Sequence, residues 1–265
     1  MSIGCRFGAT AAGGYCRRPG MPVASLHIAR YDLPTALRSA VRVWRRRGDF
    51  DTTPGLAVGA LFNTADFWTL PSPKFTPRRY AILCGWDDED ALDEFVARSP
   101  LLEAFHRGAS ETWHAKLEPA TVLEGQWRGW PDEGAELRPL EDDDPVCVMT
   151  YGRVPIRQTW TFWRANGIVV RQARENPAML GWLGLADKIG RASTFSVWRT
   201  VAEAKAFAYG PGDHAPVVRP SRTVPWLEDR FFARFRPLGS AGTIDGRDPV
   251  GEALARDLAA APAPG

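Results

Sequence analysis

The sequence has little cysteine, lysine and histidine, and it lacks any long apolar run. Its four cysteines show no CxxC spacing and have no histidine close by, which argues against a zinc site. No stretch approaches the roughly 18 apolar residues that a membrane-spanning helix needs. The net charge is only +2, and 29 arginines alternate with acids instead of forming a block, which argues against a nucleic-acid partner.

The sparse cysteines also bear on the cellular compartment. Cys84 and Cys147 lie in apolar strand-like runs, where buried thiols are expected, and we predict a reducing, cytoplasmic location. Residues 1–20 lack the apolar centre of a signal peptide and have no hydrophobic period. We therefore expect them to be disordered, or Met21 to be the true start.

Aromatic residues, by contrast, are abundant. The chain has 11 tryptophans and 13 phenylalanines. Such side chains supply large, rigid apolar surfaces, and most of them should lie in the core. Eleven tryptophans exceed what a core of this size needs, so the composition also predicts a large apolar cavity.

One pattern occurs twice. Trp86 and Phe95 are nine residues apart, as are Trp198 and Phe207, and both pairs are related by an offset of 112 residues. In each case a strand-like run ends at the tryptophan and a helix-like run follows. Four segments recur in the same order, which indicates an internal duplication.

The order of predicted elements within each copy is strand, helix, strand, strand, helix, strand. In the first helix of the first copy, Leu33, Leu37, Val41 and Trp44 stand at helical spacing. In the second copy the corresponding helix, over 155–176, is predicted to break near Gly167.

This order defines the expected domains and fold. We predict a first repeat over 21–124, a linker over 125–145, a second repeat over 146–250 and a flexible tail over 251–265. The βαββαβ order is that of the ferredoxin-like unit. The fold class is thus α+β, with two tandem repeats packed back to back as a dimeric α+β barrel-like pseudo-dimer. Its pocket should lie between sheet and helices or inside the barrel.

Four segments resemble the spheroidene monooxygenase family of carotenoid ketolase-like oxygenases. They are FTPR at 75–78, TWH at 112–114, STFSVWRTVAEAKAFAYGPGDH at 193–214 and FFARFRPLGSAGTIDGRDPV at 231–250. The resemblance spans about Val23 to Val250. It implies a dimeric α+β barrel, a haem cofactor and the insertion of oxygen into an acyclic carotenoid.

A haem needs an axial ligand, usually His, Cys or Tyr, and the chain has four histidines. His27 is expected to be an ordinary strand residue, and His106 suits a helix C-terminus. His114 lies on a polar strand face that borders either solvent or a cavity. His214 follows the second-copy helix after a Gly-Pro turn and is the preferred ligand, with a surface loop as the alternative.

Further residues near His214 could serve the same site. Asp213 could orient its ring, and Arg219 and Arg222 could meet haem propionates. Arg234 and Arg236, on the last strand, are the other propionate candidates; a solvated strand face is their alternative. Trp182, Trp198 and Phe207 are interpreted as packing residues, with substrate contact as their alternative.

The leading hypothesis is a haem-dependent monooxygenase acting on a long apolar, carotenoid-like substrate. Two alternatives stay open: a cofactor-independent oxygenase or isomerase on the same barrel, and a non-enzymatic carrier of haem or another apolar ligand. The chain carries no GxGxxG, GxxxxGK[ST], GxSxG or HExxH motif. The sequence leaves open the electron donor, a homo-oligomer and peripheral contact with a membrane.

Overall fold

The computed structural model describes residues 22–66, 74–132, 134–187, 191–210 and 227–260. The predicted disorder of residues 1–20 and the position of His214 lie outside these ranges. Within them, eight strands close into one antiparallel barrel in the order β1-β3-β2-β6-β7-β5-β8-β4. The strands are β1 (Val23–Arg30), β2 (Leu56–Asp66), β3 (Lys74–Trp86), β4 (Glu111–Glu124), β5 (Val146–Arg153), β6 (Met179–Ala186), β7 (Arg191–Trp198) and β8 (Glu228–Gly242).

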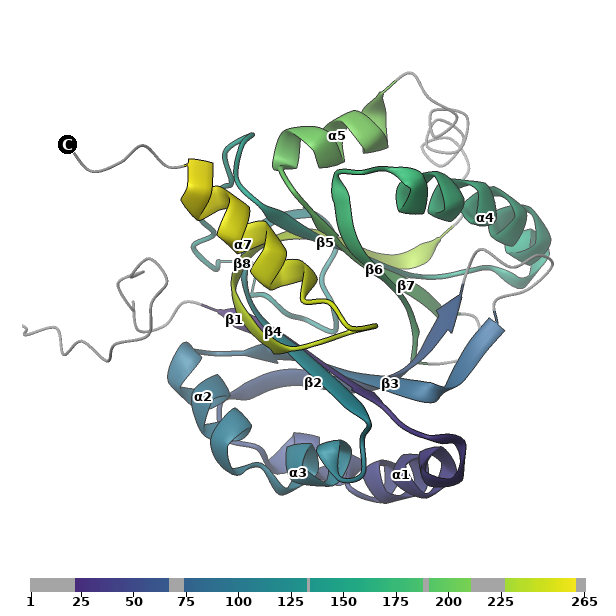
Figure 1. The fold of residues 1–265 in the computed structure, drawn as a ribbon, viewed down its shortest axis with the longest axis vertical. Coiled ribbons are helices and arrows are strands. Elements are labelled where there is room, and N and C mark those ends of the chain that lie inside the picture. Colours follow the sequence, from purple (N-terminus) through teal and green to yellow (C-terminus); the bar gives the residue numbers. More distant parts are fainter. Residues whose placement is uncertain (1–21, 67–73, 133, 188–190, 211–226, 261–265) are drawn as a thin grey trace, which may run out of the picture.

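The helices of the two halves lie on opposite sides of this barrel (Figure 1). The first half carries α1 (Leu33–Arg45), α2 (Glu89–Arg98) and α3 (Pro100–His106), and the second carries α4 (Thr159–Glu175) and α5 (Val201–Tyr209). Short 3-10 turns, η1 (Arg47–Thr52) and η2 (Ile156–Gln158), and a last helix, α7 (Pro249–Ala260), complete the chain. β2 pairs with β6 and β4 with β8, so the halves share one sheet.

The strand registers confirm the duplication. Trp86 pairs with Val23 at the end of β3, and Trp198 pairs with Val146 at the end of β7. The ring of Trp86 lies 4.8 Å from that of Phe95, and the ring of Trp198 lies 5.1 Å from that of Phe207. The two tryptophans are therefore equivalent, and the predicted α+β class with tandem ferredoxin-like repeats is confirmed.

The barrel interior is a packed core. Side chains of every strand meet there, and Trp127 and Trp130, from the segment between the halves, fill it together with Phe62 and Phe235. A Cβ on Gly85 would lie 2.6 Å from the ring of Trp130, so only glycine allows this approach. The segment 125–145, expected to be only a linker, thus supplies part of the core, and the interior is excluded as the main pocket.

Two predictions of local structure are wrong. α4 runs unbroken through Gly167, because burial of Phe162, Val170 and Ala173 outweighs the cost of about 1 kcal/mol for glycine in a helix. The tail expected to be flexible from residue 251 instead forms most of α7. Val250 and Ala253 pack into the barrel core.

α7 begins at a well-bonded cap. The Asp248 carboxylate accepts hydrogen bonds from the Gly251 amide (3.1 Å), the Ser240 hydroxyl (2.8 Å) and Trp113 Nε1 (2.9 Å). A capping carboxylate satisfies amides that the helix leaves unpaired. This cap holds the C-terminal helix against β4 and β8.

α1 forms where helical spacing predicts a helix, but its apolar face does not pack against the protein. Its buried residues are Ala36, Ser39 and Val43. The apolar residues at helical spacing, by contrast, are exposed: Leu33, Leu37, Val41 and Trp44.

No described helix is long and apolar enough to cross a membrane.

Candidate functional site

A cavity of about 300 Å³ lies in the second half, between the outer face of the sheet and the helices α4 and α5. Most of its wall is apolar, and the aromatic side chains come from three strands and both helices. The rings are Phe162, Trp182, Trp198, Phe207 and Phe232. Trp182, Trp198 and Phe207, interpreted from the sequence as packing residues, all line it.

The cavity exists because large residues of the first repeat have small counterparts in the second. At the offset of 112 residues, Tyr80, Ile82 and Leu92 correspond to Ala192, Thr194 and Ala204. The first-repeat residues pack in a continuous cluster under α1, α2 and α3. Their counterparts all line the cavity.

Two histidines of the first half add to this difference in side-chain size between the halves. His27 pairs with both Ile82 and His114, and Thr150 pairs with both Thr194 and Phe232. His27 is therefore the counterpart of Thr150, and His114 is the counterpart of Phe232. The stacked imidazoles, 5.7 Å apart, fill the first half where the second half is open.

The polar groups of the cavity are few and mostly bonded to one another. Thr150 Oγ1 lies 2.6 Å from Thr194 Oγ1, and Ser196 Oγ accepts a hydrogen bond from Trp198 Nε1 at 2.9 Å. Asn166 Nδ2 and Ser193 Oγ, however, are buried without a hydrogen-bond partner among the described residues. Since a buried unpaired polar group costs free energy, these two atoms suit a polar atom of a ligand.

Arg230 is the one charged residue in the described lining. Its guanidinium makes an ion pair of 2.5 Å with Glu124 at the edge of the barrel. The described lining contains no His, Cys, Tyr, Asp, Glu or Lys. These described residues therefore offer neither a general base nor a usual haem ligand.

The histidines that the structure describes all lie in the other half. His27 is fully buried and bonds to Ser25 Oγ at 3.0 Å, and His106 and His114 flank it. Burial lowers the pKa of all three, and their proximity to one another lowers the pKa of His27 further. No group of three potential metal ligands occurs within the described ranges.

These histidines predict a stability that falls in acid. Because the folded-state pKa values lie below the ordinary value of 6.5, the unfolded chain binds more protons below about pH 6.5. The contribution of His27 is thus complete above that pH and decreases by up to about 1.4 kcal/mol per pH unit as pH falls, and the two more exposed histidines contribute less. We expect His27→Gln to flatten the slope of unfolding free energy against pH between about pH 6.5 and 5, measured by urea denaturation. An unchanged slope would contradict the role of His27.

The predicted propionate candidates lie on the same face of β8 as Arg230 but beyond the cavity lining. Arg236 is buried, and it makes an ion pair with Asp144 (3.0 Å), contacts Glu118 at 3.6 Å and donates to the Pro139 carbonyl (3.0 Å). This network ties the segment between the halves to the sheet. Arg234 is half-buried on the same face. The propionate role of Arg234 and Arg236 stays a prediction.

Sequence reasoning missed Arg230, Asn166 and Ser193. Arg230 could have been found from the strand alternation that it shares with Phe232 and Arg234. Asn166 carried no signal, because the helix that positions it was predicted to break one residue later. Comparison of the two repeats, position by position, would have located the small residues around Thr194.

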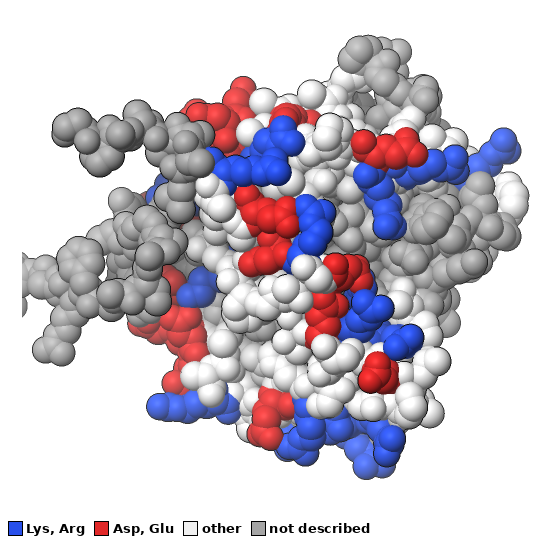
Figure 2. Space-filling view, in the orientation of Figure 1, with Lys and Arg blue, Asp and Glu red and all other residues white. Residues whose placement is uncertain are grey.

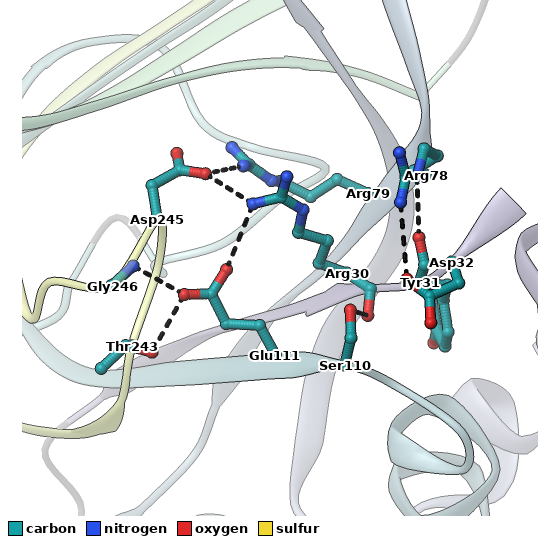
Figure 3. Close-up of polar contacts among 10 residues, drawn as sticks. All are labelled: Arg30, Tyr31, Asp32, Arg78, Arg79, Ser110, Glu111, Thr243, Asp245 and Gly246. Atoms are coloured by element: carbon teal, nitrogen blue, oxygen red, sulfur yellow. Dashed lines mark hydrogen bonds and ion pairs between the residues drawn. The ribbon is translucent and has the colours of Figure 1, made fainter.

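The family-like segment at 231–250 has a clear structural role at one rim of the barrel (Figure 3). Asp245, in the turn after β8, makes ion pairs with Arg30 (3.1 Å) and Arg79. Glu111 accepts hydrogen bonds from Thr243 Oγ1 (2.9 Å) and the Gly246 amide (2.8 Å), which lower its pKa against the effect of burial. The turn is thereby fixed to β1, β3 and β4 of the first half.

Comparison with known proteins agrees with this architecture. No protein-family profile matches the chain. Spheroidene monooxygenase of Rhodobacter capsulatus is 28% identical over 244 residues, which cover 87% of this chain and 96% of that protein. Its counterpart in Cereibacter sphaeroides is 28% identical over 210 residues, which cover 76% of this chain and 64% of that protein. The chain is similar to the spheroidene monooxygenases over most of its length. The resemblance noted from the sequence is thus confirmed, and these relatives are monooxygenases by name.

Solved structures support the fold alone. Aldoxime dehydratase superimposes with a TM-score of 0.56 at 10% identity, over 82% of this chain and 81% of that one. An aldoxime dehydratase in complex with butyraldoxime gives 0.54 at 10% identity, over 88% and 85%. The chain therefore shares its fold with proteins of low sequence identity.

Proposed function

We propose that the protein is a haem-dependent monooxygenase that takes a long apolar, carotenoid-like substrate into the cavity between the sheet and the helices α4 and α5. The observation that carries the proposal is the cavity itself, open and lined by aromatic rings in one repeat and filled in the other. Homology to proteins named spheroidene monooxygenase supports the reaction class and the kind of substrate.

The walls suit a polyene segment. Flat aromatic rings and small alanines bury an extended apolar chain without polar competition. At about 300 Å³ the cavity is at the small end of ligand sites, so it accepts one end of a long substrate and leaves the rest outside. Asn166 Nδ2 and Ser193 Oγ can bind an oxygen atom at that end, which would fix the position of the chain.

The described lining of the cavity supplies no His, Cys or Tyr ligand for a haem iron. Arg230 can meet a propionate. We propose His214 as the axial ligand, since the other three histidines lie in the opposite half. When bound, a haem would supply the oxygen activation that a monooxygenase needs.

A cofactor-independent oxygenase on this barrel would need a general base to remove a proton from its substrate. A hydrocarbon polyene offers no acidic proton for such a base to remove. The kind of substrate therefore favours the haem-dependent reaction. A carrier would bind the same ligands without turnover, and assay with a reductant and oxygen separates it from an enzyme.

The test is titration of the purified protein with haemin, followed by absorption spectroscopy. We expect a Soret band that is lost or strongly shifted in His214→Ala while the far-UV circular dichroism is retained. His114→Ala, in the filled half, is the matched control and should keep the spectrum. If His114→Ala loses the band and His214→Ala keeps it, the ligand is on β4. A wild-type protein that binds no haemin refutes the haem proposal and leaves the substrate cavity to be tested separately.

A further inference from the structure

The outer face of α1 carries four exposed apolar side chains in one stripe. Leu33 is 64% exposed, Leu37 74%, Val41 44% and Trp44 56%. Their spacing of four, four and three residues places them along one side of the helix. A contiguous apolar stripe of this kind on a folded surface is a sign of an interaction site.

The opposite face of α1 holds the helix firmly on the protein. Ala36, Ser39 and Val43 are buried, and Arg42 donates hydrogen bonds to the carbonyls of Ala104 (2.9 Å) and Arg107 (2.5 Å). These contacts fix the rotation of the helix about its axis. The stripe is therefore presented outward by the folded structure.

The charges within α1 itself are all of one sign. Residues 33–48 contain five arginines and no acid. Apart from the anchored Arg42, these are Arg38, Arg45, Arg46 and Arg47, and the Arg47 guanidinium lies 4.4 Å from the centre of the Trp44 ring. The acids that flank the helix are both paired with arginines: Asp32 with Arg78 at 3.4 Å and Asp49 with Arg46 at 2.9 Å. Figure 2 shows basic side chains gathered at the lower right edge, where Figure 1 places α1.

We propose that α1 docks the protein on a phospholipid surface that contains anionic lipids. Leu33, Leu37, Val41 and Trp44 would enter the boundary between headgroups and acyl chains, and the arginines would meet the lipid phosphates. An amphipathic helix with apolar side chains on one face and arginines beside them binds such surfaces in the plane of the interface. Tryptophan favours the same depth of the membrane.

The charge pattern decides between a membrane and a second copy of the chain. A two-fold contact through this stripe would use the same surface twice, so it would place two surfaces of net positive charge against each other. Like charges at that distance repel, whereas anionic headgroups neutralise them. The proposal is independent of the haem and of the reaction, although a membrane is also where a long apolar substrate dissolves.

The test is co-sedimentation of the full chain with vesicles of equal parts phosphatidylglycerol and phosphatidylcholine, and with vesicles of phosphatidylcholine alone. We expect binding to the anionic vesicles that weakens with added salt. The double variant Leu37→Glu, Trp44→Glu should reduce the partition coefficient by at least about tenfold, because it removes apolar area and adds negative charge. Arg45→Gln and Arg47→Gln should each reduce it by about fivefold.

The controls make the same changes elsewhere. Leu123→Glu alters an exposed leucine of β4 (47% exposed), and Arg98→Gln alters an exposed arginine of α2. Both should bind vesicles like the wild type. The proposal is overturned if the wild type ignores anionic vesicles, or if the α1 variants bind them unchanged. It is also overturned if light scattering shows a wild-type dimer that Leu37→Glu, Trp44→Glu converts to a monomer without any vesicle binding.

Discussion

Thr194→Trp is expected to abolish binding and oxidation of an apolar polyene while the barrel stays folded. Thr194 lies on β7 at the wall of the cavity, where its hydroxyl meets that of Thr150 at 2.6 Å. An indole at this position would occupy the space that the first repeat fills with Ile82 and His27. Since a misplaced substrate costs about a hundredfold in rate, a blocked cavity should cost at least that much.

Thr194→Val is the matched control, because it keeps the size of the side chain and removes only the hydroxyl. We expect it to retain carotenoid binding, measured by the shift of the carotenoid absorption and by quenching of tryptophan fluorescence. Circular dichroism and the melting temperature report on the fold of both variants. Full turnover by a folded Thr194→Trp protein would show that the substrate binds elsewhere. Because this assay follows substrate, it can fail while haemin binding by His214 succeeds.

Trp127→Ala and Trp130→Ala should each destabilise the protein by about 3–5 kcal/mol, although both lie between the repeats in a segment without strands or helices of its own. Trp127 is 1% exposed and Trp130 5% exposed, and both belong to the core inside the barrel. Trp130 stacks on Phe235 with 6.5 Å between ring centres, and Trp127 lies 6.3 Å from Phe62. Truncation leaves a cavity that eight hydrogen-bonded strands cannot collapse to fill.

The measurement is thermal unfolding, in which we expect a fall of about 6–20 °C for a chain of this length. Trp160→Ala makes the same chemical change on α4, where the side chain is 62% exposed, and should shift the melting temperature little. If the core variants melt like Trp160→Ala, the segment 125–145 is a linker after all and the barrel is filled without it.

The two repeats share one arrangement of strands and helices, but one of them is packed and the other holds a cavity. The tryptophan–phenylalanine pair closes the same end of both halves. Beneath it, His27, Ile82 and Leu92 pack the first half, and Thr150, Thr194 and Ala204 leave the second half open. A few exchanges of large for small residues are enough to turn one of two equal spaces into a site, because the shared barrel keeps the walls in place.

The sequence by itself determined the duplication, the order of the elements and the fold class. Each of these is read from patterns among residues that are close in sequence or related by a fixed offset. Strand alternation, helical spacing and the recurrence of Trp86 and Phe95 as Trp198 and Phe207 are all of this kind.

The tertiary structure alone decided which surfaces are buried. Helical spacing groups Leu33, Leu37, Val41 and Trp44 on one face but does not say whether that face meets the protein, since burial depends on what packs across from it. The same holds for Trp127 and Trp130, which reach the barrel core from a segment without periodicity. It holds also for His27 and His114, which the pairing of β1 with β4 brings together across 87 residues of chain. The contacts of the two tryptophans and the two histidines form only when the barrel closes, because closure makes neighbours of strands that are far apart in sequence.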